Sequence, residues 1–287
     1  MLFYALLCYN CRMTSANPGT AARQDTSRRL PAGRKAALVA AVTEAGQVTV
    51  ADLAQQFSVS LDTIRRDLDS LDADGLLIRT HGGAVSPQSG AKPDTALDVR
   101  KQVQTSAKDT IGALAASLVH DGDTIMVNGG TTALALARHL SERRDLTVAT
   151  NNLLLSTELD PACFRNLYMF GGTVRAQDHV SIGPVHLGGL AGGVDLDVRC
   201  RLSLIAVGGV NTTSFSTSNV AEATMMRDMM EAGDSVAVLI DSSKFNRKLF
   251  AQFAPLAMAD YLVTDQRPGD EYMHAFEQAG VEVICPD

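Results

Sequence analysis

The chain has 287 residues, of which 46% are hydrophobic and 20% are charged, and its formal net charge at pH 7 is −7. This length accommodates two domains, and the composition is that of an ordinary globular protein. No apolar stretch reaches the ~18 residues that a membrane-spanning helix needs, so no membrane partner is expected. The negative net charge disfavours indiscriminate binding to nucleic acid.

Residues 1–29 are not expected to form part of either domain. Residues 1–8 are apolar, but no basic residues precede them and no small-residue cleavage site follows, so a secretory signal is not expected. Translation could equally begin at Met13, and we treat residues 1–29 as a disordered extension or a wrongly assigned start. Cys8 and Cys11 form a C-x-x-C pair without a second pair for zinc. Five cysteines without a disulfide pattern are typical of reduced thiols in the cytoplasm.

Two amphipathic segments near the N-terminus predict two helices in close succession. Residues 34–45 carry apolar side chains on one face and stop at Gly46. Residues 50–58 repeat apolar side chains at helical spacing after Thr49, which forms a capping box with Asp52. Ser58 and Val59 then make the short turn expected before the second helix of a helix-turn-helix.

The next segment, residues 60–71, has the pattern of a helix that enters a DNA groove. Ser60 is a good N-cap, and Asp62 lies in the first turn, where the helix dipole favours an anion. Thr63 and Arg66 fall on the polar face, with Arg65 on its flank. Arginine can donate two hydrogen bonds to guanine, and threonine can bond to a phosphate. The opposite face is apolar and consists of Leu61, Ile64, Leu68 and Leu71. An isolated Arg-Arg pair is more often a solvated surface, so the interpretation depends on the flanking sequence.

A short hairpin is predicted after this helix. Gly75 suits the C′ position, where a left-handed backbone is needed. Residues 76–79 are expected to form a strand, Gly82 and Gly83 a turn, and residues 84–85 the returning strand. Three helices followed by a two-stranded wing make a winged helix-turn-helix domain, which we assign to residues 30–86.

This segment closely resembles the DNA-binding domain of the DeoR family of bacterial transcription regulators. The resemblance covers residues 34–85 and is carried by residues 59–68, VSLDTIRRDL, and residues 79–84, RTHGGA. It implies that the partner is a double-stranded DNA operator. The residues expected to contact DNA are Ser60, Thr63, Arg65, Arg66, Arg79 and His81. Residues 31–86 hold seven acidic and five basic side chains, so DNA affinity has to come from the placement of single arginines.

The remainder of the chain has the pattern of an α/β domain. Residues 87–99 are turn-rich and polar and are predicted to be a linker, and residues 100–287 form the second domain. Short apolar strands alternate with helices there, which favours a mostly parallel sheet covered on both faces. The predicted strands are residues 124–127, 146–149, 167–170, 202–207, 236–240, 261–263 and 281–284. The predicted helices are residues 109–119, 132–140, 220–232 and 270–279.

Small and hydroxyl residues follow five of these strands, at residues 128–132, 150–152, 171–173, 208–209 and 241–244. In an open α/β sheet, ligands bind beyond the carboxyl ends of the strands, and helix starts suit phosphate. Lys244 would add a positive charge. Any one of these loops is more simply a tight turn, whereas five in one sheet favour a site for a small anionic ligand.

These runs resemble the C-terminal sensor domain of the DeoR family, so the resemblance extends over residues 34–285. That fold is related to ribose-phosphate isomerase and coenzyme A transferases, and family members typically sense phosphorylated sugars or related metabolites. The residues that the resemblance assigns to effector binding are Lys108, Asn128, Gly130, Thr131, Thr132, Thr150, Asn151, Gly171, Gly172, Asp241 and Lys244.

Two positions depart from the family pattern. Asn128 stands where a carboxylate that could bind sugar hydroxyls is usual, and Met226 stands where a lysine is common. The loss of one anion and one cation indicates an altered effector or weakened sensing.

The sequence therefore predicts a cytoplasmic, sequence-specific DNA-binding regulator, expected to be a homo-oligomeric repressor controlled by a sugar phosphate. No cofactor, metal site or catalytic residue is expected. Two alternatives stay open. One is an isomerase-like enzyme with a DNA-binding appendage, for which Asp241 and Lys244 are the obvious acid–base candidates. The other is a DNA-binding regulator whose C-terminal domain does not sense.

Overall fold

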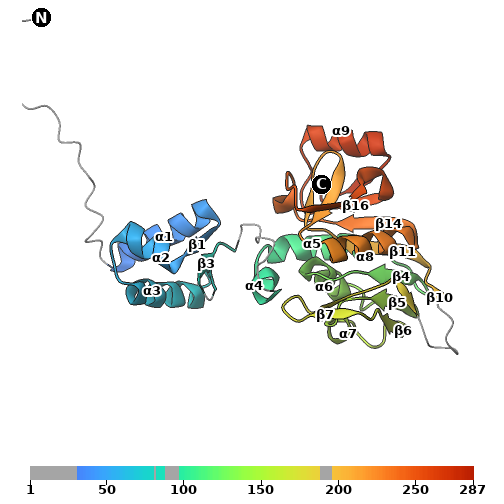
Figure 1. The fold of residues 1–287 in the computed structure, drawn as a ribbon, viewed down its shortest axis with the longest axis horizontal. Coiled ribbons are helices and arrows are strands. Elements are labelled where there is room, and N and C mark those ends of the chain that lie inside the picture. The colour runs from blue at the N-terminus through green and yellow to red at the C-terminus, as the bar shows by residue number, and fades with distance from the viewer. Residues whose placement is uncertain (1–30, 81, 88–96, 188–195) are drawn as a thin grey trace, which may run out of the picture.

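The computed structural model describes residues 31–80, 82–87, 97–187 and 196–287. It contains an N-terminal winged helix and a larger C-terminal α/β domain (Figure 1). None of the described helices is long and apolar enough to cross a membrane. The expected extension over residues 1–29 lies outside the described residues.

The N-terminal domain consists of three helices and a small antiparallel sheet. Its elements are α1 (Pro31–Ala45), β1 (Gln47–Thr49), α2 (Val50–Phe57), α3 (Leu61–Ala73), β2 (Ile78–Arg79) and β3 (Gly83–Val85). The predicted caps are confirmed, because the Asp52 amide donates to Thr49 Oγ1 over 3.1 Å and the Thr63 amide donates to Ser60 Oγ over 3.2 Å. Gly75 has the predicted left-handed backbone, with φ 70°.

The core of this domain lies between the three helices and the sheet. It is built from the buried apolar faces predicted for the helices, including Leu38, Leu53, Ile64 and Leu68. An ion pair that the sequence did not predict joins α1 to α3, with 2.6 Å between Arg34 Nε and Asp67 Oδ2. Since Asp67 is buried, this pair orients α3 against the rest of the domain.

Three details of the winged helix differ from the predictions. A third strand, β1, pairs with β3, so the wing sheet has the order β1-β3-β2. Leu61 was expected in the apolar stripe but is 45% exposed, because it occupies the first turn, beyond the helices that cover the rest of α3. Residue Leu76 is also exposed, and the second strand begins only at Ile78.

The C-terminal domain has a seven-stranded parallel sheet in the order β17-β16-β14-β11-β4-β5-β6. Its strands are β4 (Thr124–Val127), β5 (Leu146–Thr150), β6 (Phe164–Met169), β11 (Cys200–Ala206), β14 (Gly233–Leu239), β16 (Tyr261–Val263) and β17 (Glu282–Ile284). Its helices are α4 (Leu97–Gln102), α5 (Thr105–Ala116), α6 (Thr131–Arg138), α7 (Leu155–Glu158), α8 (Val220–Glu231) and α9 (Asp270–Ala279), with short 3₁₀ turns at Ser242–Lys244 and Leu256–Met258. All seven predicted strands and all four predicted helices are present.

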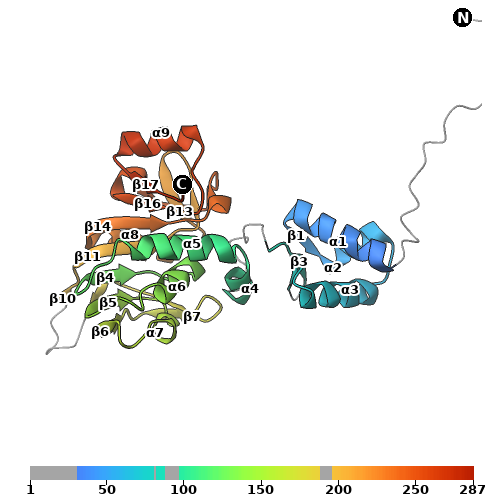
Figure 2. The same ribbon diagram turned by 180° about the vertical axis from the view of Figure 1, so that it is seen from behind.

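Helices cover both faces of this sheet, as the uninterrupted apolar strands predicted. Strand β14 alternates between the two layers: Val236 and Val238 pack toward α8 and α9, whereas Ala237 and Leu239 pack toward α5, α6 and α7. Helices α5 and α6 are neighbours, as the two opposite views of the molecule both show (Figure 1, Figure 2). At Gly112, an added Cβ would lie 2.8 Å from the Ala135 carbonyl carbon, so these two helices approach too closely for a side chain at that position.

Three small antiparallel sheets accompany the parallel sheet in the described residues, and their strands were not predicted. They are β7 (Thr173–Arg175) with β8 (Val180–Ile182), β9 (His186–Leu187) with β10 (Leu196–Asp197), and β12 (Gly209–Val210) with β13 (Ser214–Thr217) and β15 (Ala251–Pro255). The predicted linker, residues 87–99, is also too long, because α4 begins within it at Leu97. Leu97 and Val103 are buried, and this burial stabilises a helix that the polar composition upstream had obscured.

Candidate DNA-binding and effector-binding sites

The exposed face of α3 carries the predicted base-reading residues. Arg65 and Arg66 are both exposed, on a helix whose other face is buried in the domain core. Arg65 forms an ion pair with Asp62, with 3.0 Å between Nη1 and Oδ1. Ser60 and Thr63 bond to each other at the start of α3, so part of their hydrogen-bonding capacity is used in the cap. Arg66 is therefore the α3 arginine best placed to donate both of its terminal amino groups to a base edge.

Arg79 has internal partners that the sequence did not reveal. Its guanidinium pairs with Asp69 over 3.1 Å and donates to the carbonyls of Thr80 and Gly83. These contacts join α3 to the wing, so Arg79 has a clear structural role in addition to any DNA contact. His81, predicted to contact DNA, lies outside the described residues.

A pocket lies at the carboxyl edge of the large sheet, where the loops after β4, β11 and β14 converge. These three strands are adjacent in the centre of the sheet. The residues of the predicted effector set that line the pocket are Lys108, Gly130, Thr131, Thr132, Asp241 and Lys244. Three of the five expected ligand loops are thus brought together by the order of the strands.

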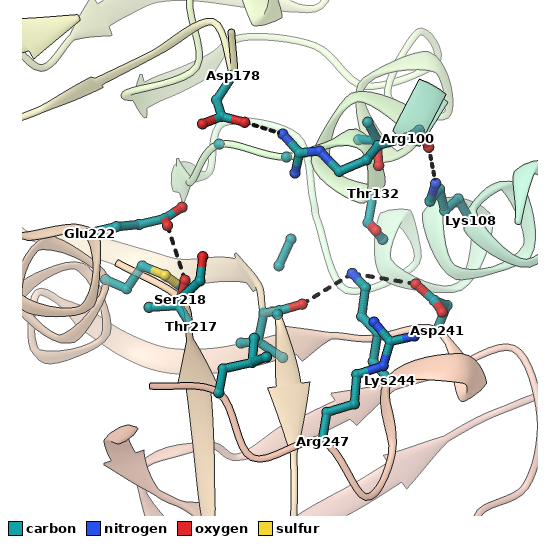
Figure 3. Close-up of a pocket in the computed structure, with 18 of the residues that line it drawn as sticks. Arg100, Lys108, Thr132, Asp178, Thr217, Ser218, Glu222, Asp241, Lys244 and Arg247 are labelled. Atoms are coloured by element: carbon teal, nitrogen blue, oxygen red, sulfur yellow. Dashed lines mark hydrogen bonds and ion pairs between the residues drawn. The ribbon is translucent and has the colours of Figure 1, made fainter. Parts of the chain in front are cut away.

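One end of the pocket is suited to a phosphate (Figure 3). Gly130, with φ 134°, is the N-cap of α6 and supplies no side-chain cap, so the first-turn amides of this helix remain available for an anion. Lys244 points into the same end, where its Nζ lies 3.3 Å from Asp241 Oδ2 and donates to the Val207 carbonyl over 3.1 Å. Arg247 and Lys108 also line the pocket there.

Lys108 is almost fully buried, and its charge state responds to its surroundings. Burial, reinforced by Lys244, lowers the pKa of Lys108 to about 7, although Asp241 opposes this shift. Burial by itself would raise the pKa of Asp241, but Lys244, Ser243 and Lys108 together hold it below the usual value. At neutral pH this end of the pocket therefore contains an ionised carboxylate and a lysine that is partly neutral, whose protonated form a bound anion would favour.

The opposite end of the pocket contains a set of ion pairs with balanced charge. Arg100 Nη2 lies 2.5 Å from Asp178 Oδ1, and Arg175 Nη2 lies 2.9 Å from Asp178 Oδ2. Arg175 also approaches Glu222 at 4.0 Å, and Glu222 accepts a hydrogen bond from Thr217. Carboxylate oxygens of this kind can accept hydrogen bonds from the hydroxyl groups of a ligand.

Asn128 and Thr150 do not line the pocket, contrary to expectation. The Asn128 amide bridges neighbouring strands, since Nδ2 donates to the Ala206 carbonyl over 2.9 Å and Oδ1 accepts from the Ala206 amide over 2.7 Å. Thr150 Oγ1 donates to the Val127 carbonyl and is fully buried. Both side chains satisfy backbone groups where strands end, which explains their polarity without a ligand.

Asn151, Gly171 and Gly172 anchor the β7–β8 hairpin and do not line the pocket either. Asn151 Nδ2 donates to the Ser181 carbonyl over 2.8 Å, and the Ser181 amide donates back to the Asn151 carbonyl. At Gly172, an added Cβ would lie 2.2 Å from the Ile182 carbonyl oxygen, so glycine permits the close approach of the hairpin. Strands β5 and β6 are the last two on one side of the sheet, and this hairpin contacts the loops that follow them.

The hairpin carries residues to the pocket that sequence reasoning missed. The hairpin supplies Arg175, Asp178 and Val180, and α4 supplies Arg100. Neither the hairpin nor α4 was predicted from the sequence. Glu222 and Met226 come from α8. The departure noted at Met226 therefore falls in the pocket itself, whereas the one at Asn128 does not. A charged turn between two short strands, residues 173–182, was the available signal for the hairpin.

The fold and the pocket define a class: a winged-helix DNA-binding domain joined to an α/β domain with a pocket lined by basic side chains. Family models agree with both halves, since the DeoR-like helix-turn-helix domain matches residues 34–90 and the DeoR C-terminal sensor domain matches residues 103–266. This chain belongs to the DeoR family of DNA-binding transcriptional regulators.

Individual relatives agree with this assignment over most of their length. The HTH-type transcriptional repressor GlcR of Bacillus subtilis is 30% identical over 254 residues, which are 88% of this chain and 96% of GlcR. The glycerol-3-phosphate regulon repressor of Escherichia coli is also 30% identical over 254 residues, covering 86% and 96%. Among solved structures, ribose 5-phosphate isomerase A from Methanocaldococcus jannaschii is 15% identical, covers 51% of this chain and 56% of its own, and has a TM-score of 0.35, a likeness too low to carry a conclusion.

Proposed function

We propose that this protein is a transcriptional repressor whose operator affinity is lowered by a monophosphorylated sugar or polyol bound in the C-terminal pocket. The observation that carries the proposal is the pocket itself. In a DeoR-family chain, it combines uncapped amides at the start of α6 with Lys108 and Lys244. The names of the two relatives above, both repressors, support the direction of regulation.

The charges of the pocket support a ligand with a single anionic group. At the phosphate end, Lys108, Lys244 and Arg247 outnumber the one carboxylate, Asp241. At the other end, two arginines face two carboxylates in ion pairs, so a second phosphate would meet no surplus of positive charge. A neutral, hydroxylated chain is the complementary group for that end, because its hydroxyls can donate to Asp178 and Glu222.

Operator binding is proposed to use α3 in the major groove, with Arg66 reading a base and Arg65 contacting phosphate. The domain is not basic overall, so a single winged helix would bind weakly. Two winged helices on two half-sites would supply the missing affinity, and we therefore propose that the repressor acts as a homo-oligomer in the cytoplasm.

Binding without turnover is the proposed role of the pocket. An isomerase needs a base that is free to take a proton from the substrate. Asp241 is the candidate base, but it is ion-paired with Lys244 and accepts a hydrogen bond from Ser243. The same pairing suits a site that holds a phosphate and leaves the ligand unchanged.

The test combines ligand binding with DNA binding on the full chain. Thermal-shift and calorimetric titrations would compare triose, pentose and hexose monophosphates with fructose 1,6-bisphosphate and with unphosphorylated sugars. We expect a monophosphate to bind and to release the protein from the DNA upstream of its own gene in a gel shift. Tighter binding of the bisphosphate, tighter binding of a free sugar, or chemical conversion of the ligand would contradict the proposal.

A further inference from the structure

Helix α4 lies between the effector pocket and the DNA-binding wing. Arg100 and Val103 line the pocket. Val103 also contacts the wing, where it packs with Val99, Ile78 of β2 and Val85 of β3 in a small apolar cluster. Ile78, Val85 and Val103 are each at most 5% exposed, so the cluster is a closed contact between the domains.

A backbone hydrogen bond also joins this segment to the wing. The Gln104 amide, which follows α4, donates to the carbonyl of Pro87, just after the wing, over 2.9 Å. A displacement of α4 would therefore alter both the apolar cluster and this hydrogen bond. Since β2 and β3 form the wing, such a displacement reaches the part of the molecule that flanks α3.

Lys108 holds α4 in place from the side of the pocket. Its Nζ donates to the carbonyl of Arg100, in the last turn of α4, and to that of Val103, the residue just after the helix. Helix α4 has only six residues, and so short a helix has little stability of its own. Below its pKa of about 7 the amine of Lys108 is a cation, and a cation at the C-terminus of a helix stabilises it by binding the free carbonyls. Lys108 is thus part of what keeps α4 folded against the wing.

The same ammonium group belongs to the phosphate end of the pocket. Lys108 lines the pocket close enough to Lys244 and Asp241 to interact with both electrostatically. A bond from an ammonium to a charged phosphate adds the attraction between opposite charges, which a bond to a neutral carbonyl lacks. A phosphate at the start of α6 would therefore compete with the α4 carbonyls for the donors of Lys108.

We propose that Lys108 couples the pocket to the wing: a bound phosphate draws its ammonium away from the carbonyls of α4, which loosens α4 and its contact with Ile78 and Val85. This inference rests on the proposed function, because it assumes a phosphate ligand and an operator. It makes Lys108 a positioning residue for the wing as well as a ligand-binding one. Linkage then requires operator DNA to weaken phosphate binding by the same factor by which phosphate weakens operator binding.

Hydrogen exchange of the full chain tests the coupling without knowledge of the natural effector. Lys108→Met removes the donors to α4. At pH 6, where Lys108 is mostly protonated, we expect the amides of residues 97–104 to exchange roughly tenfold faster in this variant, the loss expected for a charge-assisted hydrogen bond. Lys101→Met is the matched control, because it removes an exposed lysine of the same helix that is paired with Glu158 at 3.6 Å. Its effect on these amides should be much smaller.

A second experiment uses the wild-type protein and inorganic phosphate, so it does not depend on whether the Lys108→Met variant folds. Phosphate at saturation should accelerate exchange of residues 97–104 and of the wing, residues 78–85. Equal exchange in Lys108→Met and Lys101→Met, or bound phosphate that leaves residues 97–104 unchanged, would overturn the coupling. The proposed function would be contradicted by a different result. The protein would either not bind the upstream DNA, or bind it with an affinity that no monophosphate changes.

Discussion

At the scale of single residues, the clearest distinction is between side chains that serve the backbone and side chains that face a ligand. Asn128 was expected to bind the effector, but its amide both donates to and accepts from the backbone of Ala206. An amide can do both, whereas a carboxylate can only accept. The asparagine therefore fits its site better than the aspartate of the family pattern would.

This difference predicts the effect of Asn128→Asp. The new carboxylate would face the Ala206 carbonyl in a buried site, so we expect the free energy of unfolding to fall by about 1–3 kcal/mol. Protonation of the new carboxyl group would restore a donor, so the loss should shrink as the pH falls. Urea denaturation at pH 7 and pH 5 measures both effects. A variant as stable as the wild type at pH 7 would mean that this bridge is unimportant.

A second prediction concerns the two neighbouring arginines of α3. Arg66→Ala should remove a base contact and reduce specific DNA affinity by ~1–3 kcal/mol per half-site, because a bidentate arginine discriminates by that amount. Arg65→Ala should weaken all sequences about equally and reduce the salt dependence by about one unit of slope. Both side chains are exposed, so neither change should alter stability. Gel-shift titrations on specific and scrambled DNA at several salt concentrations separate the roles, and a change of base preference in Arg65→Ala would exchange them.

The titration of Lys108 gives a third prediction. Because burial, with help from Lys244, lowers its pKa to about 7, this amine is mostly neutral at pH 8 in the free protein. A bound dianion favours the protonated form, so binding should take up roughly one proton, and affinity should fall as the pH rises above 7. A phosphate monoester has a second pKa of about 6 and contributes little to this exchange. Calorimetry at pH 8 in two buffers of different ionisation enthalpy measures the uptake, which should vanish in Lys108→Met.

At the scale of elements, close approach between segments decides where glycine is needed. Helix α5 packs against α6 at Gly112, where an added Cβ would lie 2.8 Å from backbone atoms of Ala135. Rigid helix backbones cannot yield at such a contact without shifting the whole helix. Elsewhere, as at Gly171, nothing lies within 4 Å of an added Cβ.

Gly112→Ala and Gly171→Ala therefore form a matched pair. We expect Gly112→Ala to lower stability by about 1–3 kcal/mol in spite of the better helix propensity of alanine. Gly171→Ala should leave stability within about 0.5 kcal/mol of the wild type, as expected for an unstrained surface site. Chemical denaturation compares the two. Equal effects would show that the distance between α5 and α6 adjusts freely.

At the scale of the whole molecule, the two domains have separate hydrophobic cores. One core lies inside the winged helix, and two lie on the two faces of the large sheet. A small cluster between α4 and the wing joins them. This organisation allows the domains to unfold separately, while a small contact can still transmit a signal.

Calorimetric unfolding of the full chain should accordingly resolve two transitions. A phosphate ligand stabilises only the domain that binds it, by an amount that grows with the logarithm of its concentration. We expect the transition of the α/β domain to move to higher temperature and that of the winged helix not to rise with it. A single transition that moves as a whole would instead indicate one cooperative unit.

Features that depend on local periodicity and local chemistry were predictable from the sequence. The caps at Thr49 and Ser60, the buried faces of the three N-terminal helices and the seven parallel strands follow from patterns a few residues long. The phosphate end of the pocket was also predictable, because Gly130, Thr131 and Lys244 directly follow strands. The resemblance to the DeoR family pointed to the same domains.

Which loops lie next to one another could not be predicted from the sequence, because it depends on the order of the strands in the sheet. The order of the strands places β14, β11 and β4 side by side and β5 and β6 farther to one side, and no local pattern encodes that order. It therefore separates Thr131 and Lys244, which line the pocket, from Asn151 and Gly172, which hold a hairpin. The contact of Lys108 with α4 likewise depends on packing between elements, since a side chain's partners are set by what the fold brings within hydrogen-bonding distance.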